Sequence, residues 1–201
     1  MPRPPSEPAA VTSFGEHAEE SLQFIRRTME RSSTFTAVPG LGGAAMGTVG
    51  LAAALVAAGQ TSPERWLAVW LAAASVALCV GVTSLLRKAS RLAAPLAGPV
   101  GRRFAISLAA PLVAGAALTW GLWRNGGWAL MPAVWLLLYG TGVLAGGAFS
   151  VAAVRLLGAA CMSLGIAALA TAPEWGNVWL GAGFGVMHIV CGLHIAKRHG
   201  G

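Results

Sequence analysis

The sequence contains no aspartate, and its seven acidic residues among 201 are all glutamate. Charged residues make up 10% of the chain, whereas ordinary soluble domains carry roughly a quarter. Hydrophobic residues make up 56%. This scarcity of charge argues against an ordinary soluble domain and is typical of a membrane protein. The length suits one bundle of helices and leaves no room for a second folded domain.

Cysteine is also scarce, with three residues at positions 79, 161 and 191, all within apolar stretches. A thiol in such a stretch behaves as a small hydrophobic group, so no disulfide is expected. The net charge of +7 would suggest a nucleic-acid partner if the cations lay on one face of a soluble domain. They flank apolar stretches instead, so we interpret them as orientation signals and expect no nucleic-acid partner.

The first 33 residues differ from the rest in carrying most of the glutamate. Residues 1–12 are rich in proline and predict a disordered tail. From Ser13, which forms a capping box with Glu16, an amphipathic helix is predicted over residues 13–33. This helix is too short and too charged to cross a bilayer. We expect it to lie on the membrane, dock on the bundle or bind a partner. Its apolar stripe consists of Phe14, Ala18, Leu22, Ile25 and Met29.

Six apolar stretches of about twenty residues follow, close to the length needed to cross a hydrocarbon core of about 30 Å. Turn residues separate them, as in the sequence from Arg124 to Gly127. The predicted bundle covers residues 38–196, and residues 197–201 form a tail. The individual spans run from about 38 to 58, 65 to 86, 104 to 123, 128 to 147, 156 to 171 and 177 to 196.

The stretch from Arg87 to Arg103 sets the expected orientation of the chain. It carries five cations and no acid between two apolar spans, and short loops of this kind stay in the cytoplasm. If both termini are cytoplasmic, twelve of the 14 Lys and Arg residues lie inside, and only Arg65 and Arg124 lie outside. All eight tryptophans then fall toward the outer ends, where indole prefers the headgroup layer.

Small residues recur along the spans at a spacing that suits close helix packing. Three Gly-x-x-x-Gly motifs begin at Gly43, Gly142 and Gly181. Such motifs let two helix backbones approach closely in lipid. We favour packing within one chain, and the alternative is that one of these faces forms a homo-oligomer.

The spans contain few groups that catalysis or ion transport could use. No Asp, Glu or Lys lies within a predicted span, which argues against ion-coupled transporters and pumps. His188, Cys191 and His194 share an arc of the last span, but a metal would need ligands from other helices, and a bis-histidine haem would need another histidine at membrane depth. Ser150 and His188 invite comparison with rhomboid proteases, whose Gly-x-Ser-Gly motif the chain lacks. We assign no catalytic, metal-binding or cofactor-binding residue, and predict that the protein is not an enzyme.

Two features remain as candidate binding surfaces. The outer tryptophans are typical of interfacial anchoring, and the alternative is an outward-facing pocket for an apolar ligand. The N-terminal helix is typical of a membrane-lying anchor, and the alternative is that its apolar stripe enters a partner's groove. The candidate ligand-binding residues are Trp66, Trp70, Trp120, Trp123, Trp175, Trp179 and His188, and the candidate partner-binding residues are Phe14, Leu22, Ile25 and Met29.

Four stretches of the chain carry a family resemblance. They are the run from His17 to Gly47 with its TMERSSTFTAVPGLGGAAMG core, the segments GPVGRRFAISLAAPLVAGAALT and LLYGTGVLAGGAFS, and the C-terminal GAGFGVMHIVCGLHIAKRHGG. These segments resemble a family of uncharacterised bacterial six-span membrane proteins. The resemblance implies a bacterial origin and a membrane location, and it implies no activity.

The sequence therefore predicts an all-α protein, a polytopic membrane bundle of six transmembrane helices with an N-terminal cytoplasmic amphipathic helix. We expect it in the bacterial inner membrane, in contact with lipid. Our leading hypothesis is a non-enzymatic sensing or assembly component whose N-terminal helix docks a protein partner. The alternative is a passive permease or exporter for a small neutral or lipophilic molecule, with a path lined by Gly, Ser and Thr.

Overall fold

The computed structural model describes residues 19–25, 37–91 and 98–199. The chain divides into two units, Met1–Ser33 and Thr34–Gly201. In the first unit, residues 19–25 are helical. The rest of the predicted helix over residues 13–33 and the predicted N-terminal tail, residues 1–12, lie outside the described residues. The second unit contains every other element described below.

The described part of the second unit consists of helices joined by short turns and contains no strand, which confirms the all-α prediction. Six of its helical segments are long and apolar enough to cross a membrane, which indicates a multi-pass membrane protein. The elements are α2 (Gly40–Ala58), α3 (Pro63–Arg91), α4 (Pro99–Arg124), η1 (Trp128–Leu130), α5 (Met131–Gly147), α6 (Ala152–Ala170), η2 (Pro173–Trp175), α7 (Gly176–Leu180), η3 (Gly181–Met187) and α8 (His188–His199). The last four elements form one continuous final span.

Two helices extend further into the basic stretch than the sequence predicts. α3 continues five residues past Leu86 to Arg91, because cations in the last turn interact favourably with the negative end of the helix dipole. α4 begins at Pro99 rather than near Phe104, because proline suits the first helical position. Lys88, which the sequence places in the loop after the predicted span, therefore lies within helix α3.

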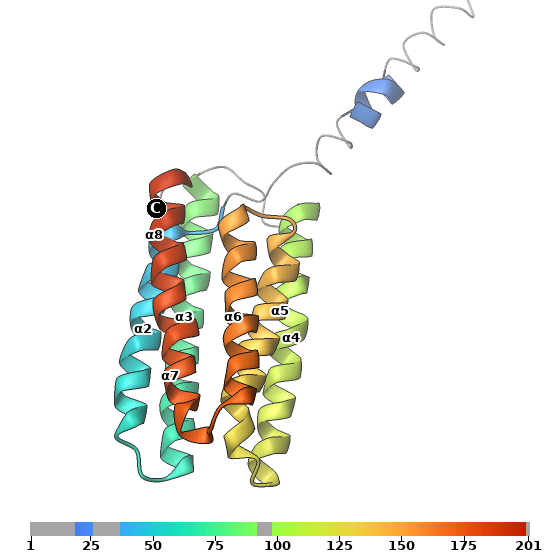
Figure 1. Ribbon diagram of the computed structural model, residues 1–201. Coiled ribbons are helices and arrows are strands. Elements are labelled where there is room, and N and C mark those ends of the chain that lie inside the picture. Colours follow the sequence, from blue (N-terminus) through green and yellow to red (C-terminus); the bar gives the residue numbers. More distant parts are fainter. Residues whose placement is uncertain (1–18, 26–36, 92–97, 200–201) are drawn as a thin grey trace, which may run out of the picture. The chain divides into compact units, whose positions relative to one another are not determined.

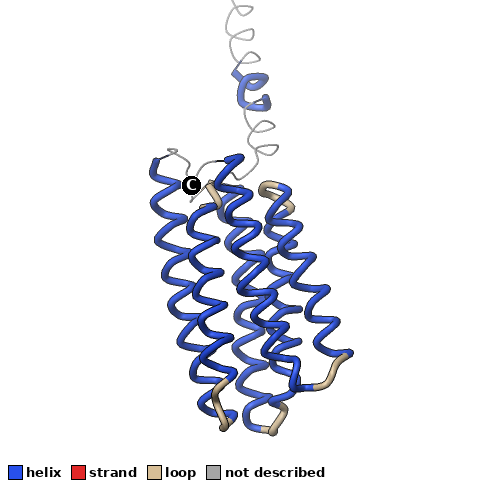
Figure 2. The backbone as a smooth tube through the Cα atoms, turned by 60° about the vertical axis from the view of Figure 1, so that its left-hand side comes forward, coloured by secondary structure: helices blue, strands red, loops and turns tan. Residues whose placement is uncertain are grey.

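The six spans form two groups of three, which Figure 1 shows as the left and right halves of the bundle. In one group, α2 packs against α3 and against α8 with its preceding segment η3. In the other, α5 packs against α4 and most extensively against α6. The final span joins the groups, because α7, η3 and α8 also contact α6. Viewed from a second direction, the helices run side by side with short connections at both ends (Figure 2).

Within each group, glycines let the helix backbones approach closely. Glycines of the three Gly-x-x-x-Gly motifs face other helices of the same chain, which supports the interpretation that they serve packing within one chain. The residue nearest to a Cβ atom added at each glycine comes from another helix. The pairs are Gly43 with Gly192, Gly47 with Ile189, Gly142 with Pro111, Gly146 with Phe104, Gly181 with Ala54, and Gly185 with Leu51.

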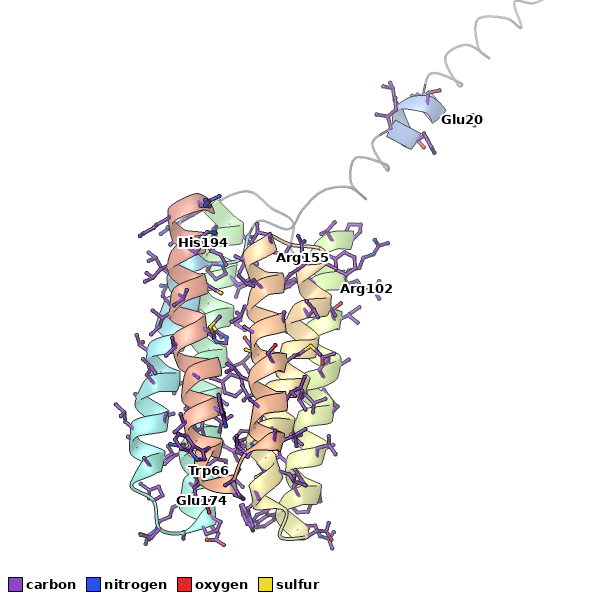
Figure 3. The ribbon with its side chains drawn as sticks, viewed as in Figure 1. Glu20, Trp66, Arg102, Arg155, Glu174 and His194 are labelled. Carbon is purple, nitrogen blue, oxygen red and sulfur yellow. The ribbon has the colours of Figure 1, made fainter. Side chains whose placement is uncertain are left out.

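The two ends of the bundle differ in chemistry. Figure 3 shows Arg102, Arg155 and His194 at one end and Trp66 and Glu174 at the other. This arrangement follows from the alternating direction of successive helices joined by short connections. Most of the basic residues therefore lie at the end of the bundle opposite the tryptophan-bearing helix ends, where only Arg65 and Arg124 lie among the described cations, as the charge pattern predicts.

We expect Gly47→Ala to lower the free energy of unfolding by about 1–3 kcal/mol, the usual cost of overpacking a core. A Cβ atom at Gly47 would lie 2.7 Å from the backbone oxygen of Gly185 and from the backbone nitrogen of Ile189. Backbone atoms cannot move aside as the end of a flexible side chain can. The measurement is unfolding of the purified chain in one detergent.

The matched control for this substitution is Gly121→Ala in α4. No atom would lie within 4 Å of a Cβ atom at Gly121. Alanine has a helix propensity about 1 kcal/mol better than glycine, so this variant should be neutral or slightly more stable. Equal destabilisation of both variants would contradict the close packing of α2 on the final span.

Candidate functional site

The structure distributes the predicted ligand-binding tryptophans over separate environments. Trp66 and Trp70 of α3 lie together, and Trp66 stacks on Trp135 of α5 with ring centroids 5.5 Å apart. Trp120 and Trp123 form a pair on α4, with the Arg124 guanidinium 5.9 Å from the Trp120 ring. On the final span, Trp175 is exposed and Trp179 donates a 2.8 Å hydrogen bond to the hydroxyl of Thr171.

Asn177 holds the first of these groups together. Its Oδ1 atom accepts hydrogen bonds from the indole nitrogens of Trp66, at 3.3 Å, and of Trp70, at 3.1 Å. Its Nδ2 atom donates a 2.7 Å hydrogen bond to the backbone oxygen of Ala54 in α2. One amide thus links α2, α3 and α7. Sequence reasoning did not identify Asn177 as a site residue. The only signal for it in the sequence is a lone polar side chain at the start of an apolar span.

Aromatic side chains continue from this point into the middle of the bundle. Trp70 lies 6.3 Å from Phe184 of η3, and Phe184 meets the edge of Tyr139 at 5.2 Å between ring centroids. Tyr139 in turn contacts His188. These side chains come from α3, α5 and the final span, so they lie where the two groups of helices meet. We call them the aromatic seam, which consists of Trp66, Trp70, Trp135, Tyr139, Phe184 and His188.

His188 is 4% exposed, and both of its ring nitrogens have partners within the chain. Nδ1 lies 2.9 Å from the backbone oxygen of Gly183, and Nε2 lies 2.6 Å from the hydroxyl oxygen of Tyr139. A carbonyl oxygen only accepts, so Nδ1 carries the proton, and the neutral ring accepts at Nε2 from the Tyr139 hydroxyl. The Sγ atom of Cys161 lies 3.9 Å from the same Gly183 oxygen. His188 therefore closes a hydrogen-bonded chain between α5 and the final span.

The final span changes its helical pitch immediately before His188. Segment η3, Gly181–Met187, is π-helical. Gly183 packs against the side chain of Leu136, and Gly185 packs against Leu51. π-helical turns inside α-helices occur frequently at functional sites, and this one places Phe184 and His188 in the seam. The apolar pattern of the sequence predicted a regular helix here, because a change of pitch leaves no signature in composition.

Lys88 is a second residue that sequence reasoning missed. Its side chain is 6% exposed, and its Nζ atom donates a 3.1 Å hydrogen bond to the backbone oxygen of Val38. This bond ties the end of α3 to the residues that precede α2. The long apolar stem of lysine lets the ammonium reach a partner from within a packed region.

In the described part of the chain, the side chains considered for catalysis or metal binding do not form an assembled site. The ring nitrogens of His188 are bonded to Tyr139 and Gly183, and Ser150 is buried near the α5–α6 turn, where its backbone oxygen lies 3.5 Å from Arg155. Among the described residues, no three His, Cys or Glu side chains lie close enough together to hold a metal ion. Both ring nitrogens of His188 and the hydroxyl of Tyr139 are thus engaged in hydrogen bonds within the bundle.

The structure describes two of the predicted partner-binding residues. Leu22 and Ile25 lie in the helical residues 19–25 and are 66% and 52% exposed. Phe24 in the same segment is 71% exposed. Phe14 and Met29 lie outside the described residues.

Comparison with known protein families, with characterised proteins and with solved structures finds no match for this chain. The resemblance to a family of bacterial six-span membrane proteins therefore rests on the sequence segments alone.

We expect Asn177→Ala to lower the free energy of unfolding by about 1–3 kcal/mol, because two indole donors and the Ala54 carbonyl lose a partner at once. Asn125→Ala is the control, since the exposed Asn125 amide bonds only the Gly121 carbonyl of its own helix in the described hydrogen bonds. Its effect should stay within about 0.5 kcal/mol. The measurement is unfolding followed by tryptophan fluorescence, and an Asn177→Ala variant as stable as the control would contradict the linking role.

Proposed function

We propose that this protein is a non-enzymatic component of the bacterial inner membrane whose N-terminal helix, residues 13–33, docks a protein partner. The observation that carries this proposal is the exposure of Leu22 and Ile25, the two members of the apolar stripe that the structure describes. Leu22 and Ile25 are exposed on a helical segment in a unit distinct from the bundle. An amphipathic helix with apolar anchors three and four residues apart is the form that grooves of partner proteins recognise.

The interior of the bundle supports an assembly or sensing role rather than a chemical one. Its polar side chains are neutral or bonded to backbone oxygens, as in the pair of Tyr139 and His188 and in the bond from Lys88 to Val38. Catalysis of proton or group transfer uses titratable groups with access to a substrate. Here the same atoms hold helices together.

The alternative of a passive permease is favoured by one feature, the division of the bundle into two groups of three helices. The groups meet along the aromatic seam, and a rocking motion of one group against the other is a common transport mechanism. The small polar residues do not favour this alternative. The hydroxyls of Ser75, Thr141 and Ser163 bond carbonyls of their own helices and lie exposed on the bundle.

The proposed orientation places both termini in the cytoplasm, with the arginine-rich end inside. A single cysteine replacing Asn125, at the opposite end, should then react with a membrane-impermeant maleimide in intact spheroplasts. Because Cys79, Cys161 and Cys191 are native thiols, the experiment uses a variant in which all three are serine. Labelling that occurs only after lysis would contradict the orientation.

The double substitution Leu22→Glu with Ile25→Glu should abolish association with the partner, because it places two charges on the docking stripe. The expected result is loss of the partner from the protein extracted gently from its own membrane, measured by native mass spectrometry. Removal of residues 1–33 should give the same loss. Circular dichroism should show that the bundle remains helical in both variants.

The matched control is Gln23→Glu, which adds a charge beside the stripe formed by Leu22 and Ile25 on the same exposed segment. This variant should keep the partner. A partner retained by the double variant would contradict docking through the stripe. A chain that never carries a protein partner but carries a small apolar molecule would favour the permease.

A further inference from the structure

The chain enters the bundle through three residues that precede α2, and we call this segment, Ala37–Pro39, the entry strap. Ala37 is 0% exposed and shares an apolar cluster with Ala89 of α3. Val38 packs against that cluster and also against a second cluster, which consists of Val143, Val151, Val154 and Ile195. Because these residues come from both groups of helices, the strap lies where the two groups meet.

The strap belongs to the end of the bundle that carries Arg102, Arg155 and His194 (Figure 3). Val154 and Ile195 are the chain neighbours of Arg155 and His194. The apolar contacts of Val38 therefore close the space between the two groups at this basic end.

Pro39 keeps the strap from becoming part of α2. The residue before a proline is disfavoured in the helical conformation, so Val38 does not extend the helix. Pro39 itself is extended, with φ −79° and ψ 116°, and its oxygen accepts a 3.0 Å hydrogen bond from the Gly43 N–H. The carbonyl of Val38 lies before the helix and accepts the 3.1 Å hydrogen bond from Lys88.

The helix that follows the strap is held firmly in place. A Cβ atom at Gly40 would overlap the backbone of Ala196, and one at Gly47 would overlap the backbone of Gly185. These contacts fix α2 against the final span. A pull on the chain ahead of Ala37 therefore acts on the strap and not on α2.

Lys88 can satisfy its charge in two positions of the strap. In the structure its side chain is 6% exposed and its ammonium bonds Val38. A buried ammonium without a partner is costly. Lys88 lies in the last turn of α3, however, so its long stem lets the ammonium reach the headgroup layer once Val38 has left.

We propose that the entry strap closes the basic end of the bundle and that docking of a partner on the N-terminal helix releases it. Only three residues, 34–36, separate the predicted docking helix over residues 13–33 from Ala37. Docking releases the strap when the partner holds the helix in a position that the closed strap does not permit. The proposal rests on the proposed docking function and adds the route by which docking reaches the bundle.

The first test measures closure in the purified chain, without a partner. A single cysteine replaces Val154, which is 5% exposed, and the three native cysteines are serine. Val38→Ala should raise the rate of reaction with a water-soluble maleimide about tenfold, because two methyl groups are lost from the strap. Val56→Ala is the matched control, since Val56 of α2 is 54% exposed, and it should change the rate less than twofold.

The second test measures release by the partner in inside-out vesicles from the native membrane. The cysteine at position 154 should react several times faster in the chain with an intact docking helix than in the chain with Leu22→Glu and Ile25→Glu. Coupling between two sites is reciprocal, so Val38→Ala should also retain more partner in native mass spectrometry than the wild-type chain.

An unchanged rate in Val38→Ala would show that the strap does not close the bundle. A cysteine replacing Leu136, which is 0% exposed, should stay unreactive in Val38→Ala, and an equal rise there would reveal general loosening and overturn the proposal. Equal rates in the second test, with the partner lost from the double variant, would refute the coupling and leave docking intact. A chain that carries no partner would refute docking itself, and the first test would still decide whether the strap closes the bundle.

Discussion

Close backbone contact at glycines is the constraint on which the rest of this bundle depends. In lipid, helices gain little from burying apolar side chains against one another, because the hydrocarbon is equally apolar. Association therefore relies on van der Waals contact and hydrogen bonds across close interfaces. At Gly47 and Gly185, side-chain and backbone atoms of the facing helix occupy the space that a Cβ atom would need. These contacts define the first group of helices, and Gly140 and Gly158 do the same between α5 and α6.

The two groups are joined by a different kind of contact. Bulky aromatic rings fill the seam between them. Toward the tryptophan-rich end, Asn177 fixes Trp66 and Trp70 to the backbone of α2 within the first group, and Trp66 stacks on Trp135 of the second group. Further along, Tyr139 of the second group bonds His188 of the first. In the low dielectric of a bundle core, leaving these two side chains unpaired is costly, so the Tyr139–His188 pair favours one alignment of the two groups of helices.

The basic end of the bundle combines internal and external roles of cations. Lys88 bonds a backbone carbonyl within the chain, whereas Arg102 and Arg103 remain on the surface above exposed apolar side chains. Burial separates these roles, because a buried ammonium needs an internal partner and an exposed guanidinium does not. Leu22 and Ile25, for which we propose partner docking, belong to the other unit of the chain.

Much of the fold could be predicted from the sequence, because its signals are local. Six apolar runs separated by turn residues predict six helices, and the distribution of arginine and tryptophan predicts which ends lie together. The boundaries were less accurate. Arg87 to Arg91 continued α3, and Pro99 began α4 earlier than apolarity alone indicated. The candidate site was predicted less well, because its residues acquire their roles from distant parts of the chain. Asn177 bonds tryptophans more than one hundred positions away, and Lys88 bonds a carbonyl fifty positions away.

The sequence by itself determined the helical class, the number of spans and the segregation of charge, because each depends on the composition of one continuous segment. Only the tertiary structure decided which helices pair, which glycines make contact and which indoles share a hydrogen-bond acceptor. It also placed a π-helical turn before His188 and brought Tyr139 within 2.6 Å of its ring. The physical reason is that such contacts depend on the rotation and axial offset of each helix against its neighbours. Those quantities are set by the packing of the whole bundle and not by any single segment.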